Sequence, residues 1–279
     1  MNSLKPLALS IVIPVYNEEN HIADCLNAIA AQTVKPDEVI VVNNNSADKS
    51  VEIIKKYPFV KLLHEKRQGL RFTRATGIAE AKGDLIGRID ADVQITPTWC
   101  EVALKTFEDP EVMAASGPSY YHDMPAKRLG LLIDNSVRRA LYSFDEPVLF
   151  GSNMVLRKSA WDKVVGNLCT DGEFFEDYDI TIHMREQGMK IVYSQDLIVG
   201  VSARRLEDDP KTFVEGMKLH TKTFEMHGLK SPVATGGKYI YITTYPLLKS
   251  IHRAYVPEEN RMSLTKFKKR SKPRPTANT

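Results

Sequence analysis

Residues 10–19 read SIVIPVYNEE, and this stretch sets the expectation for the N-terminal half of the chain. Ser10–Val15 is a short run of mostly β-branched apolar residues, which predicts a buried strand. Glu18–Gln32 then has apolar residues at the i, i+3, i+4 and i+7 spacing of an amphipathic helix. These are Ile22, Cys25, Leu26 and Ile29. A buried strand followed directly by an amphipathic helix is typical of an alternating α/β fold.

The same alternation continues to residue 92. Further strands are predicted at 39–42, 60–63 and 85–89, with helices at 46–57 and 70–82 between them. Ser46 is the predicted cap of the first of these helices, and Gly83 ends the second. The pattern predicts an α/β fold with a Rossmann-like, mostly parallel sheet flanked by helices. The second half is less regular, with strands predicted at 112–116 and 191–193 and helices at 125–143, 159–165, 175–187 and 210–227.

Polar residues follow three of the four N-terminal strands, at the point where each strand ends. Tyr16-Asn17-Glu18 follow the first strand, Asn43-Asn44-Asn45 the second and Asp90-Ala91-Asp92 the fourth. Parallel sheets bind ligands in the crevice beyond the carboxyl ends of their strands. We therefore expect all three polar clusters to line one crevice.

Asp90 and Asp92 are the first candidates for chemistry. Two carboxylates separated by one residue at a strand end can share Mg²⁺ or Mn²⁺ held against a diphosphate. Such an ion neutralises charge on a departing nucleotide diphosphate. Asp177 and Asp179 repeat the spacing, so the pattern alone is weak. The strand before Asp90 and the two companion clusters favour a metal site over solvated turn acids.

Three further groups admit two interpretations each. Glu176 and Asp177 open a predicted helix, where a carboxylate could act as general base on an acceptor hydroxyl or simply interact with the helix dipole. Gly151, close to Asn153, could let a ligand approach the backbone or form a tight bend. Arg204 belongs to an Arg-Arg pair that could bind phosphate bidentately or form a surface ion pair.

Missing patterns argue against several function classes. No GxGxxG, GxxxxGK[ST] or GxSxG occurs, which counts against a dinucleotide oxidoreductase, a P-loop NTPase and an α/β-hydrolase elbow. The three cysteines are far apart and form no CxxC pair. This spacing argues against a disulfide framework and a structural zinc site, and it suits a reducing cytoplasm. The seven histidines form no HxxxH or HExxH pattern.

Charge is spread unevenly along the chain. The net charge is +3, but residues 261–279 contain seven Lys or Arg and no acid, so the rest is mildly acidic. With its prolines and small polar residues, segment 259–279 is predicted to be a disordered tail that solubilises the chain or contacts anionic lipid. No signal peptide and no stretch of ~18 apolar residues is found. Tyr239–Leu248 could lie on a membrane surface or in a core.

Short segments of the chain occur in a characteristic order. They are residues 10–19, 32–33, 36–42, 83–84, 90–92, 151–153 with Arg157, and 176–177. Over roughly residues 8–200 this set resembles the family 2 glycosyltransferases of the GT-A fold. The resemblance implies an inverting, single-displacement transfer of a sugar from a nucleotide diphosphate to an acceptor hydroxyl.

The resemblance also implies roles for the polar residues. Asp177 matches the catalytic base, Asp92 the ligand of a divalent metal (Mn²⁺ or Mg²⁺), and Asp90 the residue that holds the donor ribose. The other implied donor-binding residues are Pro14, Tyr16, Glu18, Asn43 and Arg74. The implied acceptor or phosphate residues are Gly151, Asn153, Glu176 and Arg204.

The sequence departs from the family at several points. Asn43 stands where the family commonly has an Asp that accepts a hydrogen bond from uracil. An Asn amide oxygen could still accept, but the negative charge is lost. UDP is the first expectation, and this departure leaves GDP as the alternative. Ala75 replaces the Asn of the family's A-R-N segment, and residues 201–205 lack the late His that many GT-A enzymes offer to the metal. The Q-x-x-R-W signature of processive synthases is missing, which predicts one sugar per acceptor visit.

The prediction is a cytoplasmic, metal-dependent glycosyltransferase of envelope polysaccharide or glycolipid synthesis, with a carbohydrate or lipid-linked acceptor and peripheral membrane contact. Residues 1–117 would form the nucleotide-sugar-binding lobe and residues 118–258 the acceptor-binding and catalytic lobe. One alternative is a catalytically idle nucleotide-sugar-binding or scaffold protein, supported by Asn43 alone. Another is a nucleotidyltransferase, but its basic Gly-rich loop is replaced by acidic residues 16–19. Nucleic-acid binding is not expected.

Overall fold

The computed structural model describes residues 6–143, 147–170 and 172–268. Within these residues a seven-stranded sheet has the spatial order β3-β2-β1-β4-β8-β6-β9. Its strands are β1 (Leu9–Val15), β2 (Glu38–Asn43), β3 (Val60–His64), β4 (Leu85–Arg88), β6 (Val112–Ser116), β8 (Met154–Arg157) and β9 (Lys190–Tyr193). β8 runs antiparallel between β4 and β6, and the other neighbours are parallel. The predicted α/β class with a mostly parallel sheet is confirmed.

Helices cover both faces of this sheet because alternate residues of a strand point to opposite faces. Ile11 and Ile13 of β1 pack in one core with residues of α1 and α4, whereas Val12 packs in a second core with residues of α3, α6 and α7. The elements around the sheet are α1 (Ile22–Ala30), α2 (Ser50–Ile54), α3 (Leu70–Glu80), α4 (Trp99–Thr106), α6 (Lys158–Val164), η1 (Val165–Asn167) and α7 (Glu176–Glu186).

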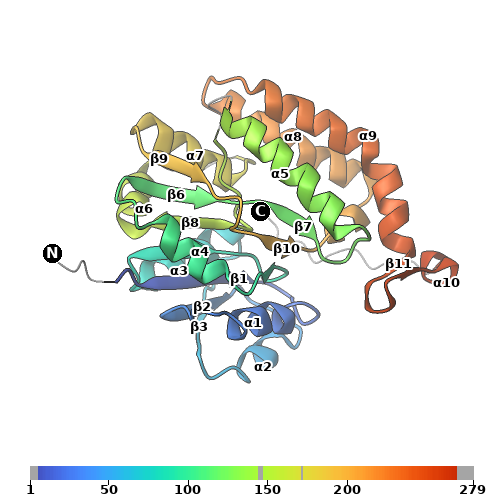
Figure 1. Cartoon of the computed structure of the whole chain (residues 1–279), viewed down its shortest axis with the longest axis horizontal. Coiled ribbons are helices and arrows are strands. Elements are labelled where there is room, and N and C mark those ends of the chain that lie inside the picture. The colour runs from blue at the N-terminus through green and yellow to red at the C-terminus, as the bar shows by residue number, and fades with distance from the viewer. Residues whose placement is uncertain (1–5, 144–146, 171, 269–279) are drawn as a thin grey trace.

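Three long helices gather at the end of the molecule away from α1 and α2 (Figure 1). They are α5 (Lys127–Ser143), α8 (Pro210–Met226) and α9 (Pro232–Ala254). A smaller sheet of β5 (Gln94–Ile95), β10 (Val199–Val201) and β7 (Ser119–Tyr121) lies between them and the end of β4, followed by η2 (Arg204–Glu207). Leu206 packs with Phe213 of α8 and Tyr245 of α9 in a separate core, which fixes η2 against these helices.

The predicted elements exist, but some boundaries move. The helix predicted to start near Ser46 begins at Ser50, because the Ser46 hydroxyl accepts a hydrogen bond from the Asn17 amide instead of capping. The apolar run 239–248 is part of α9, which was not predicted as a helix. Among the described residues, none of the helices combines the length and apolar character that a membrane crossing requires.

The segment predicted to be a disordered tail is partly folded. Its described part contains β12 (Arg261–Met262), which pairs with β11 (Tyr255–Val256), and α10 (Leu264–Lys268); η3 (Pro257–Glu259) joins the two strands. The basic composition predicted disorder for this segment, but β12 is ordered because it gains backbone hydrogen bonds from β11. Residues 269–279, which carry most of the predicted basic tail, lie outside the described residues.

Candidate functional site

The loops after β1 and β2 are fastened to each other. The Asn17 amide donates to Ser46 Oγ at 3.0 Å, and the Glu18 amide donates to Ser50 Oγ at 2.7 Å. Asn17 has φ of 55°, in the left-handed region that Asn adopts more readily than most residues. The first two polar clusters of the sequence therefore form one rim of the site.

Arg74 of α3 connects the end of β4 with the start of α7. Its Nη2 lies 3.0 Å from Asp90 Oδ1, and its Nη1 lies 2.7 Å from Glu176 Oε2. Burial alone would raise the pKa of Asp90 and of Glu176, but Arg74 and Arg88 outweigh it and hold the pKa of both carboxyl groups below the usual range. Both groups are therefore ionised at neutral pH.

Arg88, the last residue of β4, forms an ion pair with Asp177. Its side chain is fully buried, its Nη2 contacts Asp177 Oδ1, and its Nη1 lies 3.4 Å from Glu176 Oε2. Burial, followed by the charge of Arg74, lowers the pKa of Arg88 to about 10, so it remains a cation at neutral pH. We call these five charged residues the arginine–carboxylate cluster: Arg74, Arg88, Asp90, Glu176 and Asp177.

Gly151 completes the support of Asp177. Its amide donates to Asp177 Oδ2 at 2.6 Å. A Cβ at this position would lie only 2.6 Å from the same oxygen and would also collide with Arg88. A side chain is therefore excluded here by close approach of a carboxylate, so Gly151 contacts the predicted base rather than a ligand.

Arg204 of η2 joins the rim to Asp92. It makes a bidentate pair with Glu18 at 2.6 and 2.7 Å, and its Nε lies 2.8 Å from Asp92 Oδ2. Burial raises the pKa of Asp92 and of Glu18, and Arg204 offsets this effect only in part. Glu18 and Asp92, both desolvated, thus share a single arginine, and the positive charge of Arg204 compensates the two carboxylates only in part.

The loop that carries Arg204 is held by α9. Asp123 accepts from the Ala203 amide at 2.8 Å and from Ser202 Oγ at 2.7 Å. His252 of α9 lies 3.4 Å from Asp123 and 2.8 Å from Glu207. Burial would lower the pKa of His252, but hydrogen bonds and charge from the two acids raise it to about 9. His252 is therefore a cation at neutral pH.

Two predicted residues use their side chains within the protein. Asn153 is 1% exposed, and its amide accepts from Trp99 Nε1 at 2.9 Å and donates to the Leu197 carbonyl at 2.7 Å. It fixes a loop and does not reach the crevice, contrary to the expectation of an acceptor or phosphate contact. Asn43, at the end of β2, accepts from the Ser46 amide at 3.2 Å and contacts His64 Nδ1 at 3.3 Å.

The remaining predicted residues lie along β1 and just after it. Pro14 is buried within the strand, and Tyr16 is half-buried in the following loop. Arg88 was not predicted from sequence. The signal available for it was a single charged residue inside the otherwise apolar strand at 85–89, because a buried cation requires a partner.

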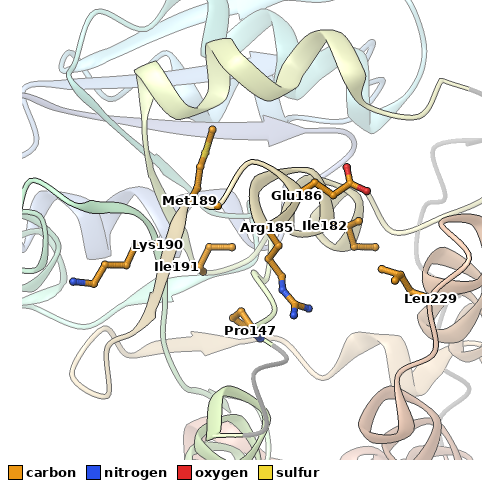
Figure 2. A pocket seen from close by; sticks show the side chains of 9 residues that line it. Pro147, Ile182, Arg185, Glu186, Met189, Lys190, Ile191 and Leu229 are labelled. Atoms are coloured by element: carbon orange, nitrogen blue, oxygen red, sulfur yellow. The ribbon is translucent and has the colours of Figure 1, made fainter.

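A pocket of 550 Å³ lies at the opposite end of α7 from Asp177. Figure 2 shows Arg185 of α7 pointing toward Pro147 across it, with Lys190 and Ile191 of β9 forming another wall. None of the predicted site residues lines this pocket. It lies at the start of β9, whereas ligands of such sheets bind beyond the carboxyl ends of the strands, so we do not assign the chemistry to it.

Comparison with known proteins gives a family match and structural neighbours. The pattern of the family described as Glycosyl transferase family 2 matches residues 10–165. EpsH of Bacillus subtilis, whose name places it among the glycosyltransferases, is 40% identical over 106 residues. That match covers 37% of this chain and 31% of EpsH, so the matched segment spans about a third of the relative's length.

Two solved glycosyltransferase structures share the fold. Mannosyltransferase PcManGT from Pyrobaculum calidifontis, in complex with GDP-Man and Mn²⁺, has a TM-score of 0.64 at 18% identity and covers 89% of this chain and 73% of its own. TarS of S. aureus (residues 1–349), in complex with UDP-GlcNAc, has a TM-score of 0.55 at 19% identity and covers 76% of this chain and 65% of its own. The fold is therefore that of the GT-A glycosyltransferases.

Proposed function

The chain belongs to glycosyl transferase family 2, and we propose that it moves one sugar per visit from a nucleotide diphosphate donor to an acceptor hydroxyl, by an inverting single displacement. The observation that carries this proposal is the position of Arg74 between Asp90 and Glu176. It joins the strand end expected to hold the donor to the helix start expected to hold the base. One site can therefore contact both reactants.

The donor side of the proposed site is the rim formed by the loops after β1, β2 and β4. Pro14, Tyr16, Glu18 and Asn43 would line the nucleotide, and Asp90 would hold the ribose. Arg74 and Arg204 are cations suited to a diphosphate, because a guanidinium binds phosphate oxygens bidentately. UDP is the first expectation and GDP the second, and PcManGT and TarS bind one donor of each kind.

The residues fit a divalent metal, Mn²⁺ or Mg²⁺, at Asp92. Burial raises the pKa of this carboxyl group, which Arg204 offsets only in part, so a second cation beside it would stabilise the charged form. Carboxylate oxygens are the donors that both ions prefer. When bound, the ion would neutralise the negative charge that develops on the leaving diphosphate. Arg204 would keep Asp92 and Glu18 aligned.

Asp177 is the proposed base. Arg88 and the Gly151 amide each contact one of its oxygens, which fixes the orientation of the carboxylate. Each oxygen keeps a second lone pair, so the group can still accept the proton of an acceptor hydroxyl. Glu176 would serve as a positioning residue, since its carboxylate holds Arg74 and Arg88 in place.

A carbohydrate or lipid-linked acceptor from envelope polysaccharide or glycolipid synthesis is the finer part of the proposal. Its support is an exposed apolar surface on α9 that includes Tyr239, Ile240 and Leu247, each 60% exposed or more. Such residues suit peripheral contact with a membrane. A cytoplasmic location is supported by the three free cysteines. Co-flotation with anionic vesicles, weakened in an Ile240→Ser and Leu247→Ser double variant, would test the contact; equal flotation would contradict it.

Nucleotide release from a panel of UDP-, GDP-, CMP- and dTDP-sugars tests the function. Release is expected from one nucleotide class, with Mn²⁺ but not with EDTA, and Asp92→Asn should abolish it. If no donor is turned over with any acceptor tried, and calorimetry detects no metal-linked donor binding, the transferase proposal fails. Metal-linked binding without turnover would favour a nucleotide-sugar-binding scaffold instead.

A further inference from the structure

A second polar cluster lies on the other side of α7, and the transferase proposal does not use it. Cys169 precedes α7, Asp179 and His183 belong to α7, and His227 follows α8. One ligand atom from each of these four residues lies within 4.8 Å of every other. We propose that Cys169, Asp179, His183 and His227, here called the zinc cluster, form a Zn²⁺ site.

The distances within the cluster suit one small ion. Asp179 Oδ1 lies 2.8 Å from His227 Nε2 and 3.5 Å from His183 Nε2, and Cys169 Sγ lies 3.8 Å from His227 Nε2. Ligand atoms around a tetrahedral zinc ion, with bond lengths of about 2.0–2.3 Å, are separated by roughly 3.3–3.8 Å. Small shifts of the side chains would bring all four atoms to such positions.

His183 is oriented for a ligand. Its Nδ1 lies 2.9 Å from Glu186 Oε2, while its Nε2 is buried and has no hydrogen-bond partner within the described part of the chain. Histidines that bind a metal usually engage their other ring nitrogen with a carboxylate in this manner, which fixes the tautomer. His183 Nε2 lies 3.5 Å from Oδ1 of the fully buried Asp179 carboxylate. A metal ion between these two atoms would coordinate both.

The chemistry of the donor set favours zinc. A thiolate, two imidazoles and one carboxylate are the ligand types of zinc sites, whereas Mg²⁺, Ca²⁺ and Mn²⁺ prefer oxygen alone. Two anionic ligands and two neutral ones would also leave no net charge with Zn²⁺. This balance matters because Asp179 is fully buried, and a buried charge without compensation is costly.

The site would cross-link three segments of the chain. The loop with Cys169, helix α7 and the end of α8 would be joined through one ion, and the Cys169 amide already donates to Asp179 Oδ2 at 2.8 Å. Asp177 lies two residues before Asp179, at the start of the same helix. A zinc ion would therefore stabilise the helix start that carries the proposed base, without contacting either substrate.

Metal analysis of the full chain tests the site without any need for activity. The protein is loaded with ZnCl₂, dialysed, and its zinc measured by atomic emission, with an expected content of about one ion per chain. Loading with Co²⁺ should give a thiolate-to-cobalt absorption band. A Cys169→Ser and His183→Gln double variant should lose both signals. His220→Gln, on α8 but outside the cluster, and Asp92→Asn should retain both.

Glu186→Gln provides a graded variant that removes no ligand. Loss of the carboxylate beside His183 should lower zinc affinity by about 10- to 100-fold, measured by competition with a chromophoric chelator. Circular dichroism of each variant checks that it is folded. A folded wild-type protein without bound zinc, or a double variant that binds as much zinc as wild type, would overturn the proposal and leave the transferase proposal untouched.

Discussion

The two polar clusters on helix α7 differ in the atoms that they present. Glu176 and Asp177 contact arginines, whereas Asp179 and His183 contact a thiol and a second imidazole. Successive residues of a helix are turned by about 100°, so Asp177 and Asp179 leave nearly opposite faces although one residue separates them. One helix start thus serves two environments of different chemistry.

The difference indicates what each cluster can bind. In the arginine–carboxylate cluster, anionic oxygens alternate with guanidinium groups, an arrangement suited to phosphates, hydroxyls and hard cations. The zinc cluster instead combines a buried carboxylate with sulfur and nitrogen ligands. Because none of its residues is a proposed zinc ligand, a change in the arginine–carboxylate cluster should leave zinc binding intact. The predictions below use that independence.

The largest effect on stability is expected from Arg88→Met. Removal of this fully buried cation leaves Glu176 and Asp177 with less compensation, which should lower the free energy of unfolding by about 3–5 kcal/mol in urea titrations. Arg67→Met, which removes a largely exposed partner of Glu65, is the matched control and should lower the free energy of unfolding far less. Equal losses in the two variants would contradict the account. Zinc content should be unchanged in both if they are folded.

A smaller loss is expected from Gly151→Ala. The added methyl group would collide with Arg88 and with the Asp177 carboxylate, so stability should fall by about 1–3 kcal/mol and nucleotide release should slow. Gly166→Ala is the control, because a Cβ there meets no atom within 4 Å. If Gly151→Ala behaves like Gly166→Ala in thermal melts and in turnover, the close support of Asp177 is disproved.

Alkaline pH should destabilise the protein through His252, which helps to hold the loop that carries Arg204. The folded-state pKa of His252 is raised from 6.5 to about 9, so its stabilising contribution is complete below pH 6.5 and is lost as the pH rises toward 9. We expect a loss of about 1–3 kcal/mol over this window in urea titrations. His252→Gln should remove this part of the pH dependence, and zinc should stay bound across it. An unchanged profile in the variant would contradict the assignment.

The sequence predicted the N-terminal half well because its signals are local. The strand at 10–15 is an apolar run of strand length, and the clusters at Asp90 and Asp177 follow or begin regular elements. Local periodicity cannot show which strand end lies beside which helix start. Arg74 and Arg204 were predicted as ligand contacts, but their pairing with Glu176 and Glu18 depends on the assembled fold.

The zinc cluster was missed for a related reason. Asp179 and His183 have the i, i+4 spacing that places two side chains on one helix face, and this was the available signal. Cys169 and His227 join them only through the packing of α7 against α8, and a search for CxxC or HxxxH patterns cannot find such a set. Asn153 was predicted to contact a ligand, but in the structure its side chain pairs with Trp99. This pairing was also invisible to local patterns, because Trp99 lies 54 residues away in the chain.

Turnover by Asp177→Asn tests the central claim most directly. The variant keeps the shape of the side chain but removes the base, so nucleotide release at saturating donor and acceptor should fall by about 10²- to 10⁴-fold. Donor affinity by calorimetry should stay near the wild-type value, and Glu173→Gln, an exposed acid of the preceding loop, should turn over normally. A folded Asp177→Asn protein with wild-type turnover would contradict the account.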